Sequence, residues 1–100
     1  MTSGSPDYSP RIVSSGSATE QLKASVTATE TIATFTQTVL SFMILNEGDN
    51  YVYFDRETGV TTDSFRISPG AGIAVDVPTL NLYFICDTDE TATVKIIGIY

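Results

Sequence analysis

The sequence predicts an all-β protein: a small antiparallel β-sandwich or jelly-roll-like domain with an extended N-terminal arm. Three observations lead to this prediction. Apolar and polar residues alternate with a period of two along short segments, turn-forming residues recur about every ten residues, and no segment longer than a few residues shows helical spacing of apolar positions. With 100 residues and a hydrophobic fraction of 42%, the chain can build a single hydrophobic core.

Residues 1–20 are predicted to form a flexible arm, and residues 21–100 the β-sandwich domain. The first segment is rich in Ser, Gly, Pro and Thr, and its few large apolar side chains cannot offset the entropy that ordering costs. Fully extended, it would reach roughly 65 Å. Two hypotheses stay open: a disordered tail, or an arm that orders on a neighbouring subunit with Tyr8, Ile12 and Val13 as its anchor.

The first part of the domain is predicted to form two strands. Residues 22–29 alternate apolar and polar side chains, which is typical of a half-buried strand. Residues 31–38 continue with β-branched residues that favour strands. We expect Ile32 and Phe35 to contact the core.

A central strand and a turn are predicted next. Residues 39–45 form a short, strongly apolar run, which indicates a strand with both faces buried. Residues 46–50, Asn-Glu-Gly-Asp-Asn, predict a hairpin turn because Gly and Asn tolerate positive φ. Further short strands, separated by polar loops or by Gly and Pro, are expected at 51–54, 65–68, 73–77, 80–86 and 91–100.

Composition excludes several classes of function. The formal net charge is −7 and the pI is near 4.1, so the surface repels nucleic-acid phosphates and anionic lipids. No secretory signal is visible, and no apolar run approaches the ~20 residues that span a bilayer. We therefore expect a protein made in the cytoplasm that binds neither nucleic acid nor membrane.

Few residues are candidates for chemistry. Histidine, the commonest general base and transition-metal ligand, is absent, and Cys86 is the single cysteine, in a run typical of a packed strand. Acidic residues cluster at three predicted turns: Glu47 and Asp49; Asp55, Glu57 and Asp63; Asp87, Asp89 and Glu90. Solvated turns explain them, with a calcium site at the third cluster or a glycosidase carboxylate pair as alternatives. We assign no catalytic, cofactor or metal residue and expect no cofactor.

Aromatic and basic residues are candidates for protein interfaces. Most of the tyrosines and phenylalanines of adjacent strands are expected in the core, with one or two tyrosines outward, where they can anchor a subunit. Arg56 and Arg66 are scarce cations on an acidic chain. They are candidates for intersubunit salt bridges, with ordinary solubility as the alternative.

From residue 38 to residue 100 the chain resembles small β-structured virion proteins of tailed bacteriophages. The resemblance rests on a succession of short phrases: Asn-Glu-Gly (46–48), Val-Tyr-Phe (52–54), Phe-Arg-Ile-Ser-Pro-Gly (65–70), Leu-Tyr-Phe-Ile (82–85) and Thr-Val-Lys-Ile-Ile (93–97). The Thr- and Ser-rich N-terminal third is also similar to arms in that group. The resemblance implies a sandwich that forms a homotrimer or larger ring and decorates a capsid or joins neck or tail parts, without catalytic residues.

The leading hypothesis is therefore a non-enzymatic virion structural protein. It would be a capsid decoration (cement) protein that stabilises the phage head through contacts with its own copies and with the major capsid protein, after assembly in the host cytoplasm. A neck, collar or tail accessory protein is the alternative within this class. Outside it, the alternative is a carbohydrate- or calcium-binding β module such as a receptor-binding tip.

Overall fold

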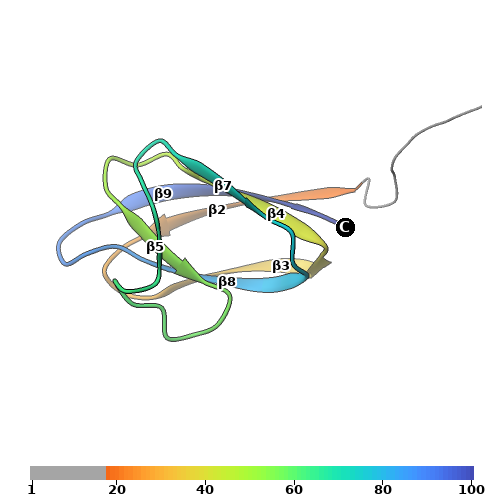
Figure 1. The fold of residues 1–100 in the computed structure, drawn as a ribbon, viewed down its shortest axis with the longest axis horizontal. Helices are drawn as coiled ribbons and strands as arrows, with labels where there is room; N and C mark the ends of the chain where they lie inside the picture. Colours follow the sequence, from red (N-terminus) through yellow and green to blue (C-terminus); the bar gives the residue numbers. More distant parts are fainter. Residues whose placement is uncertain (1–17) are drawn as a thin grey trace, which may run out of the picture.

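A computed structural model describes residues 18–100, which form eight β-strands and no helix (Figure 1). Residues 1–17, including Tyr8, Ile12 and Val13, lie outside the described part. In residues 18–100, no helix is long and apolar enough to cross a membrane. The strands are β2 (Thr19–Val26), β3 (Thr31–Val39), β4 (Ser41–Asn46), β5 (Val52–Asp55), β6 (Phe65–Ile67), β7 (Gly72–Val75), β8 (Thr79–Ile85) and β9 (Ala92–Ile99).

The strands pair into two antiparallel sheets of four strands, in the orders β2-β9-β4-β7 and β3-β8-β5-β6. The two sheets stack as layers of one sandwich, which confirms the predicted fold class (Figure 1). Among the described strands, only β5 and β6 are consecutive partners in one sheet, and every other connection crosses to the opposite sheet. The hairpin predicted at 46–50 is therefore wrong: this turn joins β4 of one sheet to β5 of the other.

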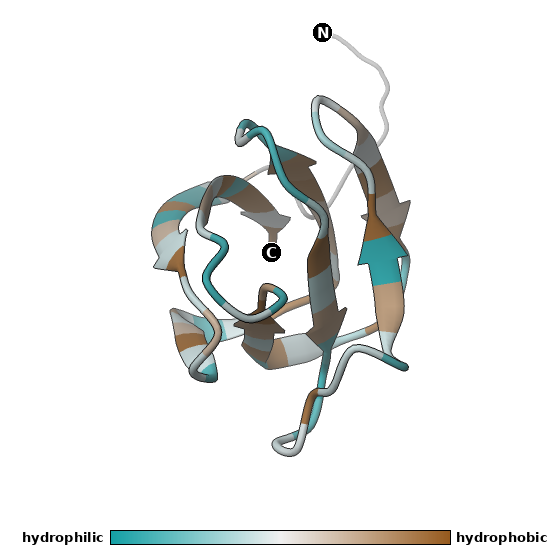
Figure 2. Cartoon of the chain, turned by 90° about the vertical axis from the view of Figure 1, so that its left-hand side faces the viewer, coloured by the Kyte–Doolittle hydropathy of each residue, from teal (hydrophilic) through white to brown (hydrophobic). Residues whose placement is uncertain are grey.

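The core lies between the sheets, and alternation along the strands fills it. Hydrophobic and hydrophilic bands alternate along the ribbons (Figure 2). Phe54 lies at the centre of an aromatic group, with its ring centroid 6.4 Å from that of Phe42 and 6.3 Å from that of Phe84. Rings at this spacing add to the stabilisation that burial of their area provides.

The two strands predicted at the start of the domain exist, with changes. β2 begins at Thr19, two residues before the predicted domain start, and ends at Val26. Phe35 is buried as predicted, but Ile32 is 56% exposed. Ile32 and Phe35 are three positions apart, and successive side chains of a strand point to opposite faces, so the two cannot both face inward. Ala33 occupies the inward position instead.

The prediction of one strand at 39–45 with two buried faces is also wrong. Val39 ends β3 in one sheet, Leu40 lies between the strands, and β4 begins at Ser41 in the other sheet. β4 is an interior strand of its sheet, but only one of its faces is covered. Met43 and Leu45 alternate with buried residues and point outward, away from the core.

The sheet edges are protected in different ways. On one side of the sandwich the edge strands β6 and β7 are short, and Phe65 packs edge-on against Phe54, with ring centroids 5.6 Å apart. On the other side β2 and β3 are long, but the carboxylate of Glu20 accepts hydrogen bonds from the N–H (2.9 Å) and hydroxyl (2.9 Å) of Thr36. Charged side chains and irregularities at an edge discourage pairing with further strands.

Glu30 holds the loop between β5 and β6. Its carboxylate accepts hydrogen bonds from the N–H of Gly59 (2.7 Å), the hydroxyl of Thr58 (2.8 Å) and the N–H of Val60 (3.1 Å). These donors, the Gly59 N–H foremost, stabilise the charged form and lower the pKa of Glu30 from its ordinary value of 4.5. Because the folded pKa lies below the unfolded one, this stabilisation is present above pH 4.5 and is lost as the pH falls through the lowered pKa.

We predict that acid releases this loop before the sandwich unfolds. Hydrogen exchange of the Gly59 and Val60 amides, corrected for intrinsic rates, should lose protection as the pH falls from 6 to 3. Glu30→Gln should lower that protection at pH 6 and remove most of its pH dependence, because a neutral amide is a weaker acceptor. Equal protection of the two proteins at pH 6 would contradict the role given to Glu30.

Candidate functional site: an exposed apolar sheet face

Large apolar side chains gather on the outer face of the β2-β9-β4-β7 sheet. Met43 is 54% exposed, Leu45 41% and Ile99 37%, and Ile97 is partly exposed. All four alternate with buried residues on the central strands β4 and β9, so they share one face. We call this surface the apolar face. Contiguous apolar patches on a soluble protein mark interaction sites more often than isolated exposed residues do.

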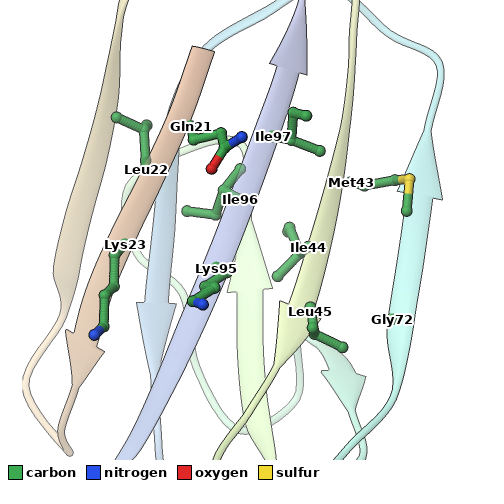
Figure 3. A pocket seen from close by; sticks show the side chains of 10 residues that line it. All are labelled: Gln21, Leu22, Lys23, Met43, Ile44, Leu45, Gly72, Lys95, Ile96 and Ile97. Atoms are coloured by element: carbon green, nitrogen blue, oxygen red, sulfur yellow. The ribbon is translucent and has the colours of Figure 1, made fainter. Parts of the chain in front are cut away.

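The strand register places these side chains in cross-strand rows. Met43 lies opposite Ile97 on β9 and opposite Ala74 on β7, and Ile97 lies opposite Gln21 on β2. The next row runs through Lys23, Lys95, Leu45 and Gly72. The rows border an open depression of about 490 Å³, shown with its lining side chains in Figure 3. Apolar side chains, together with Lys95, thus form the middle of the face.

Both lysines of the chain lie on this face as direct cross-strand neighbours. Like charges directly opposite each other on a sheet are destabilising. The Lys95 ammonium lies 3.5 Å from the Glu47 carboxylate, and both side chains are substantially exposed, so this ion pair contributes little stability. Within residues 18–100, Lys23 makes no ion pair within 4.0 Å. A chain of net charge −7 therefore carries a small basic site beside apolar residues.

The opposite outer face, on the β3-β8-β5-β6 sheet, is less continuous. Ile32 is exposed beside Tyr83. Tyr53 is buried on this face, and its hydroxyl donates to the Asp87 carboxylate at 3.2 Å. Burial and the Asp87 carboxylate raise the pKa of Tyr53. The hydroxyl of the outward-facing Tyr53 is thus already hydrogen-bonded within its own chain.

Arg56 and Arg66, the predicted interface cations, both contact their own chain. The Arg56 guanidinium donates to the Thr79 hydroxyl (3.1 Å) and the Pro78 carbonyl (3.0 Å), which ties the loop after β5 to the start of β8. The Arg66 guanidinium lies over the Tyr51 ring, 4.4 Å from its centroid. The structure does not bring the two arginines together with the apolar face, and their intersubunit roles stay predictions, as do those of Tyr8, Ile12 and Val13.

Two residues of the third acidic cluster, Asp87 and Asp89, have structural roles. Asp87 accepts the Tyr53 hydrogen bond, and Asp89 adopts the positive φ of 63° that the turn requires. Within the described part of the chain, no group of three His, Cys, Asp or Glu side chains has the geometry to hold a metal ion.

Cys86 is packed in the core, as its sequence context predicted. It is 2% exposed, and its thiol lies 3.8 Å from the Val26 carbonyl oxygen. Burial, assisted by the nearby Glu90 and Asp87 charges, raises the thiol pKa, so thiolate is scarce at neutral pH.

We therefore predict that a thiol reagent at pH 8 labels Cys86 at least a hundredfold more slowly in the folded protein than in the protein unfolded in urea. Absorbance of the released leaving group measures both rates. Labelling of the native protein at the unfolded rate would contradict the burial of this thiol.

Sequence reasoning missed the residues of the apolar face. The alternation of side chains along β4 could have revealed part of it. Once Phe42 and Ile44 face the core, Ser41, Met43 and Leu45 must face away from it. The lysine pair had no such signal, because only the β2–β9 register brings Lys23 and Lys95 together. Comparison of the sequence with protein-family models and with curated proteins finds no match.

Proposed function

We propose that this chain is a non-enzymatic structural protein that works by packing its apolar face against another protein subunit. The observation that carries the proposal is the exposure of Met43 and Leu45 beside Ile97 and Ile99 on a regular, interior part of a sheet. Burying such a face is favourable at roughly 25 cal/mol per Å² of apolar surface.

The finer proposal is a virion structural protein of a tailed phage, of the capsid decoration (cement) type. It is supported by the resemblance of residues 38–100 to that group and by the acidic surface, which suits protein rather than nucleic-acid partners. In this role the sandwich contacts sister copies, and Tyr8, Ile12 and Val13 of the N-terminal segment bind the shell protein.

Binding to empty phage shells from the same source tests this function. The full-length protein should co-sediment with the shells up to a saturating number of copies and raise the temperature at which they disrupt. Met43→Glu should weaken this binding, because it places a carboxylate in the apolar contact. Ile32→Glu, which alters an equally exposed side chain on the opposite face, should leave it unchanged.

A neck, collar or tail accessory protein is distinguished by the same assay. Binding to isolated tails or necks, and not to shells, would favour that role over capsid decoration. Absence of binding to every virion part would contradict the virion proposal.

A further inference from the structure

The apolar face is asymmetric in side-chain size from one edge of the sheet to the other. On β2, long side chains point outward at Gln21 and Lys23, and on β7, at the opposite edge, the same two rows end in Ala74 and Gly72. Between these edges lie Ile97 and Met43 in one row, and Lys95 and Leu45 in the other. The face therefore has a high edge, a largely apolar middle and a low edge.

We propose that the apolar face binds the same face of a second copy, related by a two-fold axis that runs along the strands between β9 and β4. This inference rests on the proposed function and names the subunit that covers the face. The axis places β9 against β4 and β2 against β7 of the second copy. The high edge of each copy then lies over the low edge of the other, as a self-complementary two-fold contact requires.

Side-chain pairing across this axis follows from the strand register. Ile97 faces Met43 of the second copy, and Met43 faces its Ile97, so the apolar middle interdigitates. Gln21 lies over Ala74 of the second copy in the same row. Stacked sheets pack about 10 Å apart with their strands within about 30°, which keeps these rows near one another.

The two lysines fit this arrangement. Lys95 faces Leu45 of the second copy, and Lys23 faces its Gly72, so no lysine opposes a lysine. The missing side chain at Gly72 leaves room for the Lys23 aliphatic stem, whose ammonium reaches solvent past β7. A two-fold axis across the strands would instead stack β2 on β2 and leave a gap between the two β7 strands.

The size of the face sets the strength of the contact. Four strands spaced ~4.8 Å apart and about seven residues long at ~3.3 Å per residue cover roughly 450 Å² when counted as a flat surface. A stable interface buries about 800 Å² per partner. The contact is therefore weak in isolation, and the dimer dissociates on dilution.

Sedimentation equilibrium of the full chain tests whether a second copy binds the apolar face. The mean mass should rise from one copy towards two as the concentration increases from micromolar to millimolar. Met43→Glu should weaken the association at least tenfold, whereas Ile32→Glu should leave it unchanged, because the two side chains are 54% and 56% exposed on opposite faces. A single-copy mass at every concentration, or an equal loss in both variants, would overturn the proposal.

Cross-linking with a bifunctional thiol reagent tests the axis. In the proposed dimer Gln21 faces Ala74 of the second copy across the ~10 Å between stacked sheets, which is too far for a disulfide but within reach of a reagent of about that span. The two Gln21 side chains lie farther apart, because β9 and β4 separate β2 from β7 by roughly 14 Å. With this reagent, a mixture of Gln21→Cys and Ala74→Cys should form a mixed cross-linked dimer, and either variant alone should form at least tenfold less. The native Cys86 is buried and does not compete. Cross-linking of Gln21→Cys to itself as fast as in the mixture would overturn this axis.

The proposed dimer and the proposed function can be refuted independently of each other. A protein that binds shells as a single copy refutes the dimer and leaves the structural role intact. A dimer with the expected cross-links that binds no virion part supports the two-fold contact and refutes the virion role.

Discussion

Gly98→Ala should destabilise the sandwich by about 2–3 kcal/mol, although it adds a single methyl group. Gly98 is buried on β9, and a Cβ atom there would lie 2.5 Å from Val39 Cγ1 and 2.6 Å from Phe35 Cε1. Both contacts belong to tightly buried core side chains, so relief requires the two sheets to separate or the Phe35 ring to leave its position. Overpacking of this kind typically costs 1–3 kcal/mol.

Urea and thermal denaturation measure this effect, which should lower the melting temperature by roughly 10–20 °C for a domain of this size. Gly72→Ala is the matched control, because a Cβ there meets nothing closer than 3.4 Å, and it should change stability by less than about 1 kcal/mol. Combining Gly98→Ala with Phe35→Leu should cost less than the sum of the two single changes, because the smaller side chain makes room. Additive losses would contradict the steric explanation.

Gly98 illustrates what the sequence could and could not predict. The alternation of residues places almost every strand within two residues of its true position, because burial of one face determines it. That a glycine in the last strand lies under Phe35 and Val39 depends on how the sheets stack, which involves contacts between residues far apart in the chain. Such contacts have no local sequence signal.

The strand topology could not be predicted from the sequence for the same reason. Turn residues at 46–50 predict a change of direction, and both a hairpin and a crossing between sheets satisfy that prediction. The structure has the crossing. Gly48 has a steric role there, because a Cβ would lie 2.6 Å from Ala92 Cβ, whereas positive φ occurs at Gly59, Gly70 and Asp89 in the described residues.

The position of the apolar face could not be predicted from the sequence. Isolated charges such as Arg56 and Arg66 stand out in an acidic chain and favour an interface elsewhere. The apolar face arises from the β4–β9 register, which brings together residues that look like ordinary core in a linear reading. Met43 and Ile97 are distinguished from Ile44 and Ile96 only by parity and by the absence of a covering layer.

Asn46 is the second position at which we expect a large effect. It is fully buried at the end of β4, and its amide donates to the Asn50 carbonyl (2.8 Å) and the Ile67 carbonyl (3.1 Å). Its side-chain oxygen accepts from the Gly48 N–H at 2.9 Å. One side chain thus joins the crossing turn to the end of β6. Asn46→Ala should cost about 2–4 kcal/mol, because buried backbone groups lose their partners.

Asn46→Asp should be worse than Asn46→Ala at pH 7, although it preserves the shape of the side chain. One carboxylate oxygen can still accept from Gly48, but the other would face two carbonyl oxygens, and none of these three partners is a cation. The introduced carboxyl therefore has a folded pKa raised well above its ordinary ~3.9, because only its protonated form donates a hydrogen bond.

Stability of the Asn46→Asp variant must then rise as the pH falls towards that raised pKa, since the folded state binds the proton more tightly than the unfolded state does. Urea midpoints at pH 7 and pH 5 measure the difference, and the variant should regain at least 1 kcal/mol at the lower pH while the parent protein changes little. Asn81→Asp is the control: Asn81 is only partly buried, and its side-chain oxygen accepts the Thr34 hydroxyl at 2.8 Å, a bond that a carboxylate retains. Equal pH responses of the two variants would show that the N–H donors of Asn46 contribute little to stability. The link between the crossing turn and β6 would then need another explanation.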